Sequence, residues 1–319
     1  MSRGIDRRTL IAAAVAGAAA VKAYAAGEDV ERHPIWPSQP PGGEHVTVAD
    51  EVVRRSPNGP PDDIAWPHVA TPMITVVPAL RPTGAAVLLC PGGGFTRVAV
   101  GRNGSEIAHM FAARGITAFD LLYRLPHDGW AAGPDTPLQD AQRAMRWIKA
   151  NAARWRIDPA RVAACGFSAG GYVAARLGSR ASAETYAPVD AIDRQSARPV
   201  ALGLFFPVIT MLEPSAHAVS RRELLGPDMS EARARHFSAE TDIPPEMPPT
   251  FLALAANDPV VPPANAFLMF EALQHAHIPS ELMVFEQGGH GLPLVRPDGS
   301  AHPWPGLFLD FARRHGLGD

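Results

Sequence analysis

The chain has 319 residues, of which 46% are hydrophobic and 19% are charged, and its formal net charge is −3. Residues 1–25 hold four basic residues and one acidic residue, so the remainder carries a net charge of −6. This acidic balance excludes a protein that binds nucleic acid or anionic lipid through a basic surface. The length fits one large domain better than two, because α/β folds of this size often form a single core.

The first 26 residues have the pattern of an export signal. Arg7-Arg8 precedes an alanine-rich apolar run from Leu10 to Val21, and Ala23-Tyr-Ala25 offers a cleavage site. The run is too short and too rich in alanine to be a convincing membrane anchor. We therefore expect a twin-arginine signal at 1–26, a mature chain that starts near Ala26 without membrane attachment, and a periplasmic or secreted location.

The mature chain, 27–319, is expected to form one domain that begins with polar and proline-rich sequence. Residues 27–44 predict an irregular arm on the surface. Two strand-like runs follow, from His45 to Val53 and from Val69 to Val77, and we expect them to open the sheet as an antiparallel edge. The next run, Ala85–Cys90, is apolar throughout, which is typical of a central strand covered on both faces.

From this strand onward, helical and strand-like segments alternate, which predicts an α/β fold with a mostly parallel central sheet and helices on both faces. A long insertion at 207–249 contains one short capped helix, Ser220–Gly226, and such an excursion is typical of a small lid. The remaining predicted strands are 116–122, 162–165, 200–206, 250–256 and 281–286, and the predicted helices are 104–114, 136–155, 264–275 and 304–314.

The most informative motif is Gly-x-Ser-x-Gly at Gly166, Ser168 and Gly170, directly after an apolar strand. Glycines on both sides of a serine allow a sharp turn from strand to helix, where a side chain would collide with neighbouring backbone. The turn raises one hydroxyl above the sheet at a helix N-terminus, which favours developing negative charge. Ser168 is therefore a candidate nucleophile, although such turns also serve packing and phosphate binding.

A triple glycine, Pro91-Gly-Gly-Gly-Phe95, follows the predicted central strand. Consecutive glycines let the backbone fold so that N–H groups point into a cavity. We expect an oxyanion hole formed by the N–H groups of Gly93, Gly94 and Ala169. A flexible loop without a chemical role is the competing interpretation.

A serine hydroxyl needs a base, and the base needs a group that fixes its tautomer. Asp258 follows the predicted strand 250–256, and His290 lies in Gly288-Gly-His-Gly291 after the last predicted strand. Singly, each has an ordinary explanation as a turn or loop residue. Together, the order Ser168, Asp258, His290 and the position of each beyond a strand end predict a catalytic triad.

Other residues have weaker signals. Phe95, Tyr123, His127 and Trp130 lie in loops expected near the site and could line the substrate pocket, although loop aromatics are as often hydrophobic plugs. Cys90 and Cys165 both end apolar runs, which predicts buried free thiols, with a disulfide as the alternative if their strands are neighbours. No spacing of His, Cys and Asp suggests a metal, and no cofactor is expected.

These motifs, together with Tyr123-Arg-Leu-Pro126, Pro137-Leu-Gln-Asp140 and Asp258-Pro-Val-Val-Pro262, resemble the α/β-hydrolases of the acetyl xylan esterase and feruloyl esterase-like group. The resemblance covers about 85–316 and implies a serine esterase that deacylates plant polysaccharides or their oligosaccharides. Two residues depart from related patterns: Pro91 stands where hormone-sensitive-lipase-like esterases have histidine, and Asn257 occupies a place that is often acidic.

Several alternatives stay open. A general carboxylesterase or a lactonase would share the fold, and a prolyl-oligopeptidase-like peptidase would share the triad, although the chain lacks that family's long N-terminal propeller. A non-catalytic carbohydrate-binding module is the alternative from another class. Glycoside hydrolysis needs two carboxylates flanking a sugar, for which the sequence gives no sign. The expected partner is a small-molecule or oligosaccharide ester; the acyl group, the sugar and the oligomeric state stay open.

Overall fold

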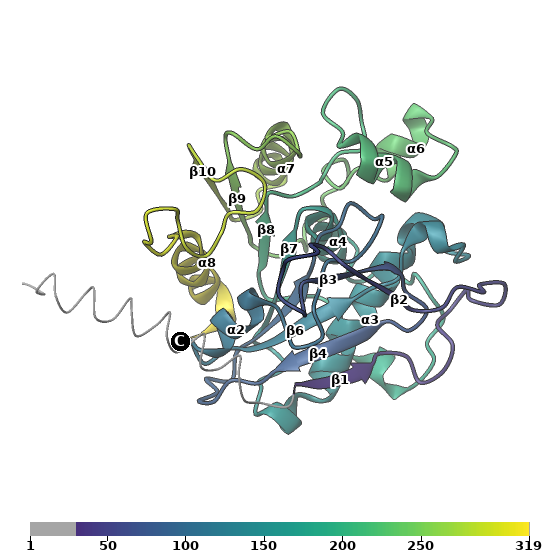
Figure 1. Ribbon diagram of the computed structural model, residues 1–319, viewed down its shortest axis with the longest axis horizontal. Helices are drawn as coiled ribbons and strands as arrows, with labels where there is room; N and C mark the ends of the chain where they lie inside the picture. Colours follow the sequence, from purple (N-terminus) through teal and green to yellow (C-terminus); the bar gives the residue numbers. More distant parts are fainter. Residues whose placement is uncertain (1–29, 319) are drawn as a thin grey trace, which may run out of the picture.

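The computed structural model describes residues 30–318, so the predicted export signal lies outside the described residues. Eight strands form one sheet in the order β1-β4-β6-β5-β7-β8-β9-β10 (Figure 1). β1 and β4 pair antiparallel at one edge, β4 pairs antiparallel with β6, and all later pairs are parallel. The strands are β1 (Glu31–Pro34), β4 (Met73–Val77), β5 (Ala86–Cys90), β6 (Thr117–Leu122), β7 (Val162–Phe167), β8 (Leu202–Phe205), β9 (Thr250–Ala255) and β10 (Ser280–Phe285).

Helices cover both faces of this sheet, as β8 illustrates. A Cβ added to Gly178 in α4 (Ala169–Ser179) would lie 2.4 Å from Leu202 Cδ1, and one added to Gly203 would lie 2.9 Å from Phe308 Cε2 in α8 (Trp304–Ala312). Successive strand residues point to opposite faces, so α4 and α8 lie on opposite sides. The fold class predicted from the sequence is confirmed. The main helices are α2 (Glu106–Ala112), α3 (Thr136–Ala150), α4 (Ala169–Ser179), α7 (Ala264–His275) and α8 (Trp304–Ala312).

Coverage on both faces explains why the central strands are apolar at every position instead of alternating. All residues of β5, β6, β7 and β9 are buried. Asp120 in β6 is the charged exception among them. Its carboxylate accepts hydrogen bonds from the backbone N (2.6 Å) and the Oγ (2.9 Å) of Ser105, the residue that caps α2.

The N-terminal predictions need correction. The arm expected to be irregular contains β1, which a sequence pattern does not reveal because a four-residue edge strand of polar residues pairs through its backbone. The strand predicted from His45 is only β2 (Glu51–Arg54), which pairs with β3 (Ile64–His68) in a separate two-stranded sheet. The strand predicted from Val69 begins at Met73, after Pro72, which has no N–H to donate to a ladder.

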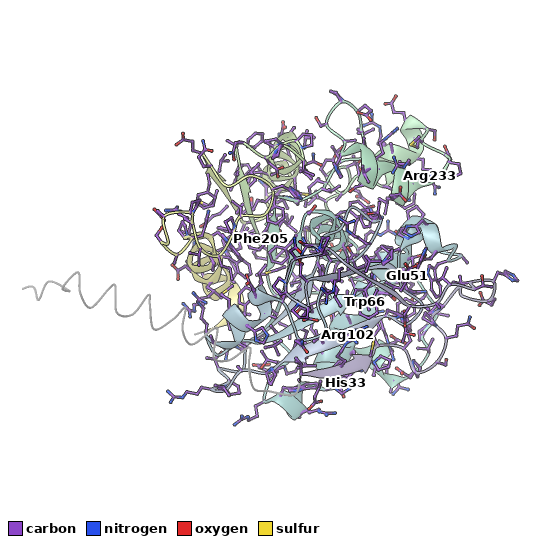
Figure 2. The ribbon with its side chains drawn as sticks, in the orientation of Figure 1. His33, Glu51, Trp66, Arg102, Phe205 and Arg233 are labelled. Atoms are coloured by element: carbon purple, nitrogen blue, oxygen red, sulfur yellow. The ribbon has the colours of Figure 1, made fainter. Side chains whose placement is uncertain are left out.

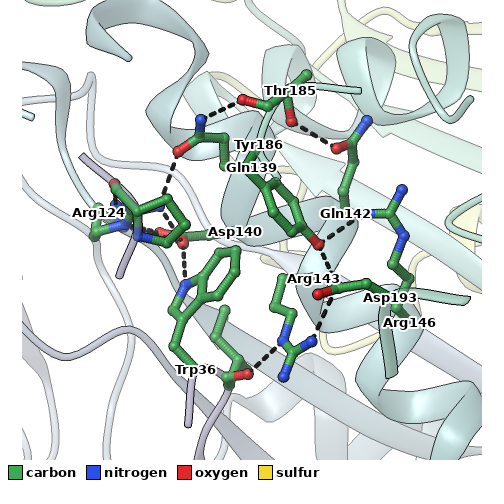
Figure 3. Close-up of polar contacts among 12 residues, drawn as sticks. Trp36, Arg124, Gln139, Asp140, Gln142, Arg143, Arg146, Thr185, Tyr186 and Asp193 are labelled. Atoms are coloured by element: carbon green, nitrogen blue, oxygen red, sulfur yellow. Dashed lines mark hydrogen bonds and ion pairs between the residues drawn. The ribbon is translucent and has the colours of Figure 1, made fainter. Parts of the chain in front are cut away.

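A buried polar network ties this N-terminal segment to the main domain (Figure 3). Trp36 Nε1 donates to Asp140 Oδ1 at 2.8 Å, and the fully buried Arg124 donates from Nε to both oxygens of the same carboxylate at 3.0 Å. Arg143 Nε donates to the Ile35 carbonyl at 2.7 Å. The N-terminal segment is therefore held against α3 by hydrogen bonds to the charged side chains of Asp140 and Arg143, which are stronger than bonds between neutral groups.

The insertion at 207–249 holds two short helices, α5 (Ala218–Leu225) and α6 (Glu231–His236), which lie together beyond one edge of the sheet (Figure 1). The helix predicted from Ser220 begins two residues earlier, because the His217 side chain caps it by accepting from Ser220 N. Within residues 30–318, none of the helices combines the length and apolar character needed to cross a membrane.

Candidate active site

The predicted site residues follow neighbouring strands of the parallel part of the sheet. Ser168 comes directly after β7, Asp258 follows β9 and His290 follows β10, while the glycine loop follows β5. The carboxyl ends of parallel strands meet at one edge, which is where open α/β sheets bind ligands. The topology thus brings together residues that are distant in the sequence, such as Gly93 and His290, which are 197 positions apart.

Ser168 sits on a strained turn. Its φ of 55° and ψ of −122° lie in a region that non-glycine residues rarely adopt. A Cβ added to Gly166 would lie 2.2 Å from the Gly170 oxygen, and one added to Gly170 would lie 2.0 Å from the Cys90 oxygen. Both glycines of the motif are therefore required by close backbone approach, as the sequence predicts.

The three predicted triad side chains are in hydrogen-bond contact. His290 Nε2 lies 2.9 Å from Ser168 Oγ, and His290 Nδ1 lies 2.8 Å from Asp258 Oδ2. The Asp258 side chain is almost fully buried, whereas about a fifth of the His290 side chain is exposed. Asp258 Oδ1 also accepts from the backbone N–H groups of Val260 (2.8 Å) and Val261 (3.1 Å), which fix the carboxylate.

Asn257 has a structural role that sequence reasoning missed. Its Oδ1 accepts from Gly289 N at 2.9 Å, and its Nδ2 donates to Gln287 Oε1 at 2.7 Å. These bonds join the loop that carries the acid to the loop that carries the histidine. Asn257, where related sequences often have an acid, therefore supplies an amide that bridges two triad loops. This role becomes visible only once β9 and β10 are known to be adjacent.

Phe206 is a second missed residue. Its ring contacts the His290 imidazole edge to face, with 4.9 Å between centroids, and its φ of 38° is unusual for a bulky residue. Its backbone N donates to the Ala253 carbonyl at 2.7 Å, which secures the turn after β8. Phe206 thus packs directly against the triad imidazole.

The glycine loop lies against the nucleophile. A Cβ added to Gly92 would be 2.9 Å from Ser168 Cβ, so Gly92, which sequence reasoning did not single out, lies directly against the nucleophile. Gly93 has a φ of 140°, and a Cβ there would lie 2.0 Å from the Arg97 oxygen; Gly94 has a φ of 67°. Ala169 is the first residue of α4, where N–H groups have no partner within their own helix.

The first turn of α5 lies next to this loop. Val219 Cγ1 is 3.7 Å from the position that a Cβ on Gly94 would take. His217, which caps α5, is close enough to the triad that the charges of His290 and Asp258 affect it. Burial and then the neighbouring His290 lower the pKa of His217.

Phe95 and Tyr123 are fully buried, so the prediction that they contact substrate is wrong. The Phe95 ring packs edge to face on Tyr172, with 5.8 Å between centroids. Tyr123 donates its hydroxyl hydrogen to the Pro91 carbonyl at 2.8 Å, and burial raises its pKa. Both side chains support the glycine loop from inside the protein.

Trp130 and His127 border hollows whose linings contain no triad residue. Trp130 is buried beneath the Arg124 guanidinium, 4.5 Å from its ring centroid, beside a hollow of about 370 Å³ lined by the N-terminal segment. The Trp130 side chain thus packs against Arg124 and the N-terminal segment, and its place in the substrate pocket stays a prediction. His127 borders a second hollow of about 730 Å³ together with Glu223 and Arg233 of the insertion.

Cys90 and Cys165 are buried free thiols, as predicted, although they lie on the adjacent strands β5 and β7. Burial raises the pKa of Cys90 to about 12 and that of Cys165 well above its usual value. Thiols react as thiolates, so neither side chain is suited to nucleophilic chemistry.

A serine, an aspartate and a histidine in this chain order, at the carboxyl edge of a mostly parallel sheet and with the serine on a strand-to-helix turn, define the α/β-hydrolase class. Within that class the chain belongs to the BD-FAE family, whose model matches residues 80–273.

Three relatives illustrate the similarity. The chain is 33% identical over 217 residues to endo-1,4-beta-xylanase B of Butyrivibrio fibrisolvens. This alignment covers 66% of this chain and 33% of that protein. It is 28% identical over 216 residues to the acetylxylan esterase of Xylanibacter ruminicola, and this alignment covers 66% of this chain and 42% of that protein. The chain thus spans less than half the length of both. The crystal structure of the acetyl ester-xyloside bifunctional hydrolase from Caldicellulosiruptor lactoaceticus superimposes with a TM-score of 0.70 and 26% identity, over 90% of this chain and 97% of that one.

Proposed function

We propose that this protein is a serine esterase that removes acyl groups, in particular acetyl groups, from sugars derived from plant polysaccharides. The observation that carries the proposal is the continuous contact from Ser168 Oγ through His290 to Asp258, at 2.9 and 2.8 Å. These distances suit proton transfer between the hydroxyl and the imidazole without rearrangement.

The reaction begins when His290 Nε2 takes the hydroxyl proton of Ser168 and Oγ attacks the ester carbonyl carbon. The tetrahedral intermediate carries a negative oxygen. His290 then gives the proton to the departing alkoxide, so the sugar alcohol leaves and the acyl group stays on Ser168. Asp258 accepts a hydrogen bond from Nδ1–H throughout, which orients the ring and stabilises its charged form.

Water completes the cycle. His290 removes a proton from a water molecule, the resulting hydroxide attacks the acyl carbon, and the proton returns to Ser168 Oγ as the free acid leaves. The partial exposure of the His290 side chain, 21%, supports access of water to its ring.

The backbone N–H groups of Gly93, Gly94 and Ala169 are the proposed donors to the oxyanion. Their support is the contact between this loop and Ser168, and the position of Ala169 at the N-terminus of α4. Such a donor contributes about 3 kcal/mol to transition-state stabilisation. Because these donors are backbone groups, deleting a side chain does not remove them. Their role can be tested only by changes that alter the conformation of the loop.

The substrate class rests on the relatives. One named relative is an acetylxylan esterase, and the similar solved structure is described as an acetyl ester-xyloside bifunctional hydrolase. We do not propose glycoside hydrolysis, although one relative is named a xylanase, because that reaction needs two carboxylates flanking the sugar bond. Among the described residues, the carboxylate of the triad is that of Asp258, and it is hydrogen-bonded to His290.

We further propose export through the twin-arginine pattern at 1–26, which would place the enzyme in the periplasm or outside the cell. A test is to express the full-length chain either with Arg7 and Arg8 intact or with the double substitution Arg7→Lys and Arg8→Lys. Retention of the second form in the cytoplasm, with release of the first, is the expected result.

The experiment that tests the activity is a panel of acetyl, feruloyl and longer-chain esters, offered both as small soluble mimics and on xylan. Ser168→Ala should lower turnover by about four to six orders of magnitude. An active-site phosphonate should label the wild type at Ser168 and leave the variant unlabelled. Sugar binding without either turnover or labelling would instead support a binding module, and cleavage of amides in preference to esters would support a peptidase.

A further inference from the structure

Three metal-ligating side chains that the proposed reaction does not use meet beside the glycine loop: His68, His127 and Asp128. Their ligand atoms all lie within 4.8 Å of one another. His68 ends β3, and the other two lie in the 3-10 helix η1 (Pro126–Asp128). The sequence predicted no metal because the first histidine is separated from the pair by about 60 positions.

Asp128 forms the buried centre of this group, and its side chain has no exposed surface. Its Oδ2 accepts from Val69 N at 3.2 Å. Its Oδ1 lies 2.6 Å from His68 Nδ1 and 3.4 Å from His127 Nε2. A fully buried carboxylate is costly unless donors and positive charge compensate it, and a cation between the two rings would supply that charge beside the bonds from His68 and Val69.

His127 strengthens the argument, because both of its ring nitrogens face oxygens. Nδ1 lies 3.0 Å from the Phe95 carbonyl oxygen, and Nε2 lies 3.1 Å from the Pro67 carbonyl oxygen. Carbonyl oxygens only accept, and a neutral imidazole has one N–H to donate. If Nδ1 donates to Phe95, the lone pair of Nε2 points at two oxygens, those of Pro67 and Asp128. A second ring proton or a metal ion between Nε2 and these oxygens would remove this conflict.

We propose that a divalent metal ion of the zinc type occupies this position, held by His68 Nδ1, His127 Nε2, Asp128 Oδ1 and the Pro67 carbonyl oxygen. Two imidazoles and a carboxylate form a ligand set that binds zinc in preference to magnesium or calcium. Ligand atoms about 2.0–2.2 Å from a tetrahedral ion are about 3.3–3.6 Å apart. The 3.4 and 3.1 Å separations around His127 Nε2 come close to this value.

The 2.6 Å contact between His68 and Asp128 is a hydrogen bond, so the bound form requires His68 Nδ1 to release its proton and the two atoms to move apart by less than about 1 Å. The His127 Nδ1–H bond to the Phe95 carbonyl matches the outer hydrogen bond that orients most metal-binding histidines. Metal binding would therefore hold β3 and η1 to the glycine loop, whose Gly93 and Gly94 immediately precede Phe95.

The charges around the cluster favour a cation. Glu223 Oε2 of α5 lies 3.7 Å from His127 Nδ1, and Glu51 Oε2 of β2 lies 3.9 Å from His68 Nε2. Figure 2 labels Glu51, which comes from the small two-stranded sheet. Arg222 pairs with Glu223 and offsets part of this charge. With Asp128, the cluster still carries more negative than positive charge when both imidazoles are neutral.

The test measures metal binding directly. Wild-type protein is treated with a chelator, desalted and titrated with ZnCl₂ by isothermal titration calorimetry at neutral pH, with the bound zinc counted by elemental analysis after dialysis. We expect one saturable zinc ion per chain at this site. Cobalt(II) at the site should give the visible absorption of a four-coordinate ion, and magnesium should compete poorly because it prefers oxygen ligands.

His68→Gln is the informative variant, because a glutamine amide can still donate to Asp128 while the imidazole ligand is lost. Its zinc affinity should fall by on the order of 100-fold or more, since even outer partners of metal ligands contribute 10- to 100-fold. His33→Gln is the matched control: His33 pairs with the carboxylate of Glu31 at 2.8 Å on β1, outside the cluster, and its loss should leave zinc affinity unchanged. His290→Ala should also bind zinc normally.

Two results would overturn the proposal. One is the lack of saturable zinc binding by a folded wild-type protein, which would assign the positive charge to a second proton on His127. The other is zinc binding that persists in His68→Gln but disappears in His290→Ala, which would place the ion at the triad. Circular dichroism of the chelated variants establishes that each is folded before titration.

Discussion

Gly170 of the nucleophile turn packs directly on Cys90, the last residue of β5: a Cβ added to Gly170 would lie 2.0 Å from the Cys90 oxygen and 2.4 Å from the Pro91 oxygen. The start of α4 is therefore pressed against the strand end that leads into the glycine loop. The two glycine-rich motifs of the sequence form one packed unit. A change in either is expected to displace the other.

Replacement of Gly170 by alanine tests this packing. The new methyl group would have to push backbone atoms aside, so we expect the free energy of unfolding to fall by at least about 1–3 kcal/mol and the esterase activity to fall with it. Urea denaturation at constant pH measures the first effect. The matched control is Gly306→Ala in α8, where nothing lies within 4 Å and alanine should stabilise the helix by up to about 1 kcal/mol. Equal midpoints for both variants would contradict the packing argument.

The triad could be predicted from the sequence because each signal is local. Ser168 is marked by its flanking glycines, and Asp258 and His290 each follow a strand that is visible as an apolar run. Parallel strands then bring their ends to one edge without further information. The contacts at 2.8 and 2.9 Å could not be read from the sequence, but the grouping of the three residues could.

Features that depend on contacts between distant segments could not be predicted. The sequence does not reveal that Tyr123 supports the Pro91 carbonyl instead of facing substrate, because burial depends on which loop covers the ring. β1 is similarly hidden, since its pairing with β4 uses backbone groups that every residue has. The meeting of His68 with Asp128 arises from β3, a strand outside the main sheet, which no periodicity in the main domain indicates.

The two cysteines should be unreactive in the folded protein. Both thiols are fully buried, and burial raises the pKa of Cys90 to about 12, so the thiolate fraction at pH 8 is very small. With Ellman's reagent at pH 8, we expect no rapid reaction under native conditions and two equivalents of released dye after unfolding in guanidinium. Fewer than two equivalents in denaturant without reductant would mean that a disulfide exists after all.

Asp120 should make stability depend on pH. Burial raises its pKa to about 6 from an ordinary value of 3.8, while the Ser105 hydrogen bonds partly oppose this shift. The folded state thus binds a proton that the unfolded state has already lost, and this contribution is present below pH 4 and disappears as the pH rises through about 6. A shift of this size corresponds to about 3 kcal/mol.

The comparison that isolates Asp120 is the pH dependence of wild type against Asp120→Asn. Urea unfolding at pH 4.0, 5.0, 6.0 and 7.0 should show the wild type losing stability relative to the variant over this range. Asparagine changes the bonds to Ser105, so the absolute stability of the variant also changes, but that difference does not vary with pH. Parallel stability curves for the two proteins would show that Asp120 does not titrate in the folded state near pH 6.

Asp258→Asn tests the orientation of the triad histidine. Asp258 Oδ1 accepts from Val260 N and Val261 N, so the asparagine oxygen should keep these bonds and turn its NH₂ group toward His290 Nδ1. A donor at this place selects the tautomer with hydrogen on Nε2, and that nitrogen can no longer take the proton of Ser168. Turnover should fall by about 10⁴-fold, while the protein stays folded by circular dichroism. Asp310→Asn is the control, because Asp310 is an exposed residue of α8 whose side chain forms an ion pair with Arg313, and the activity of this variant should equal that of the wild type. If Asp258→Asn kept a tenth or more of the wild-type turnover, a group other than Asp258 would have to orient His290.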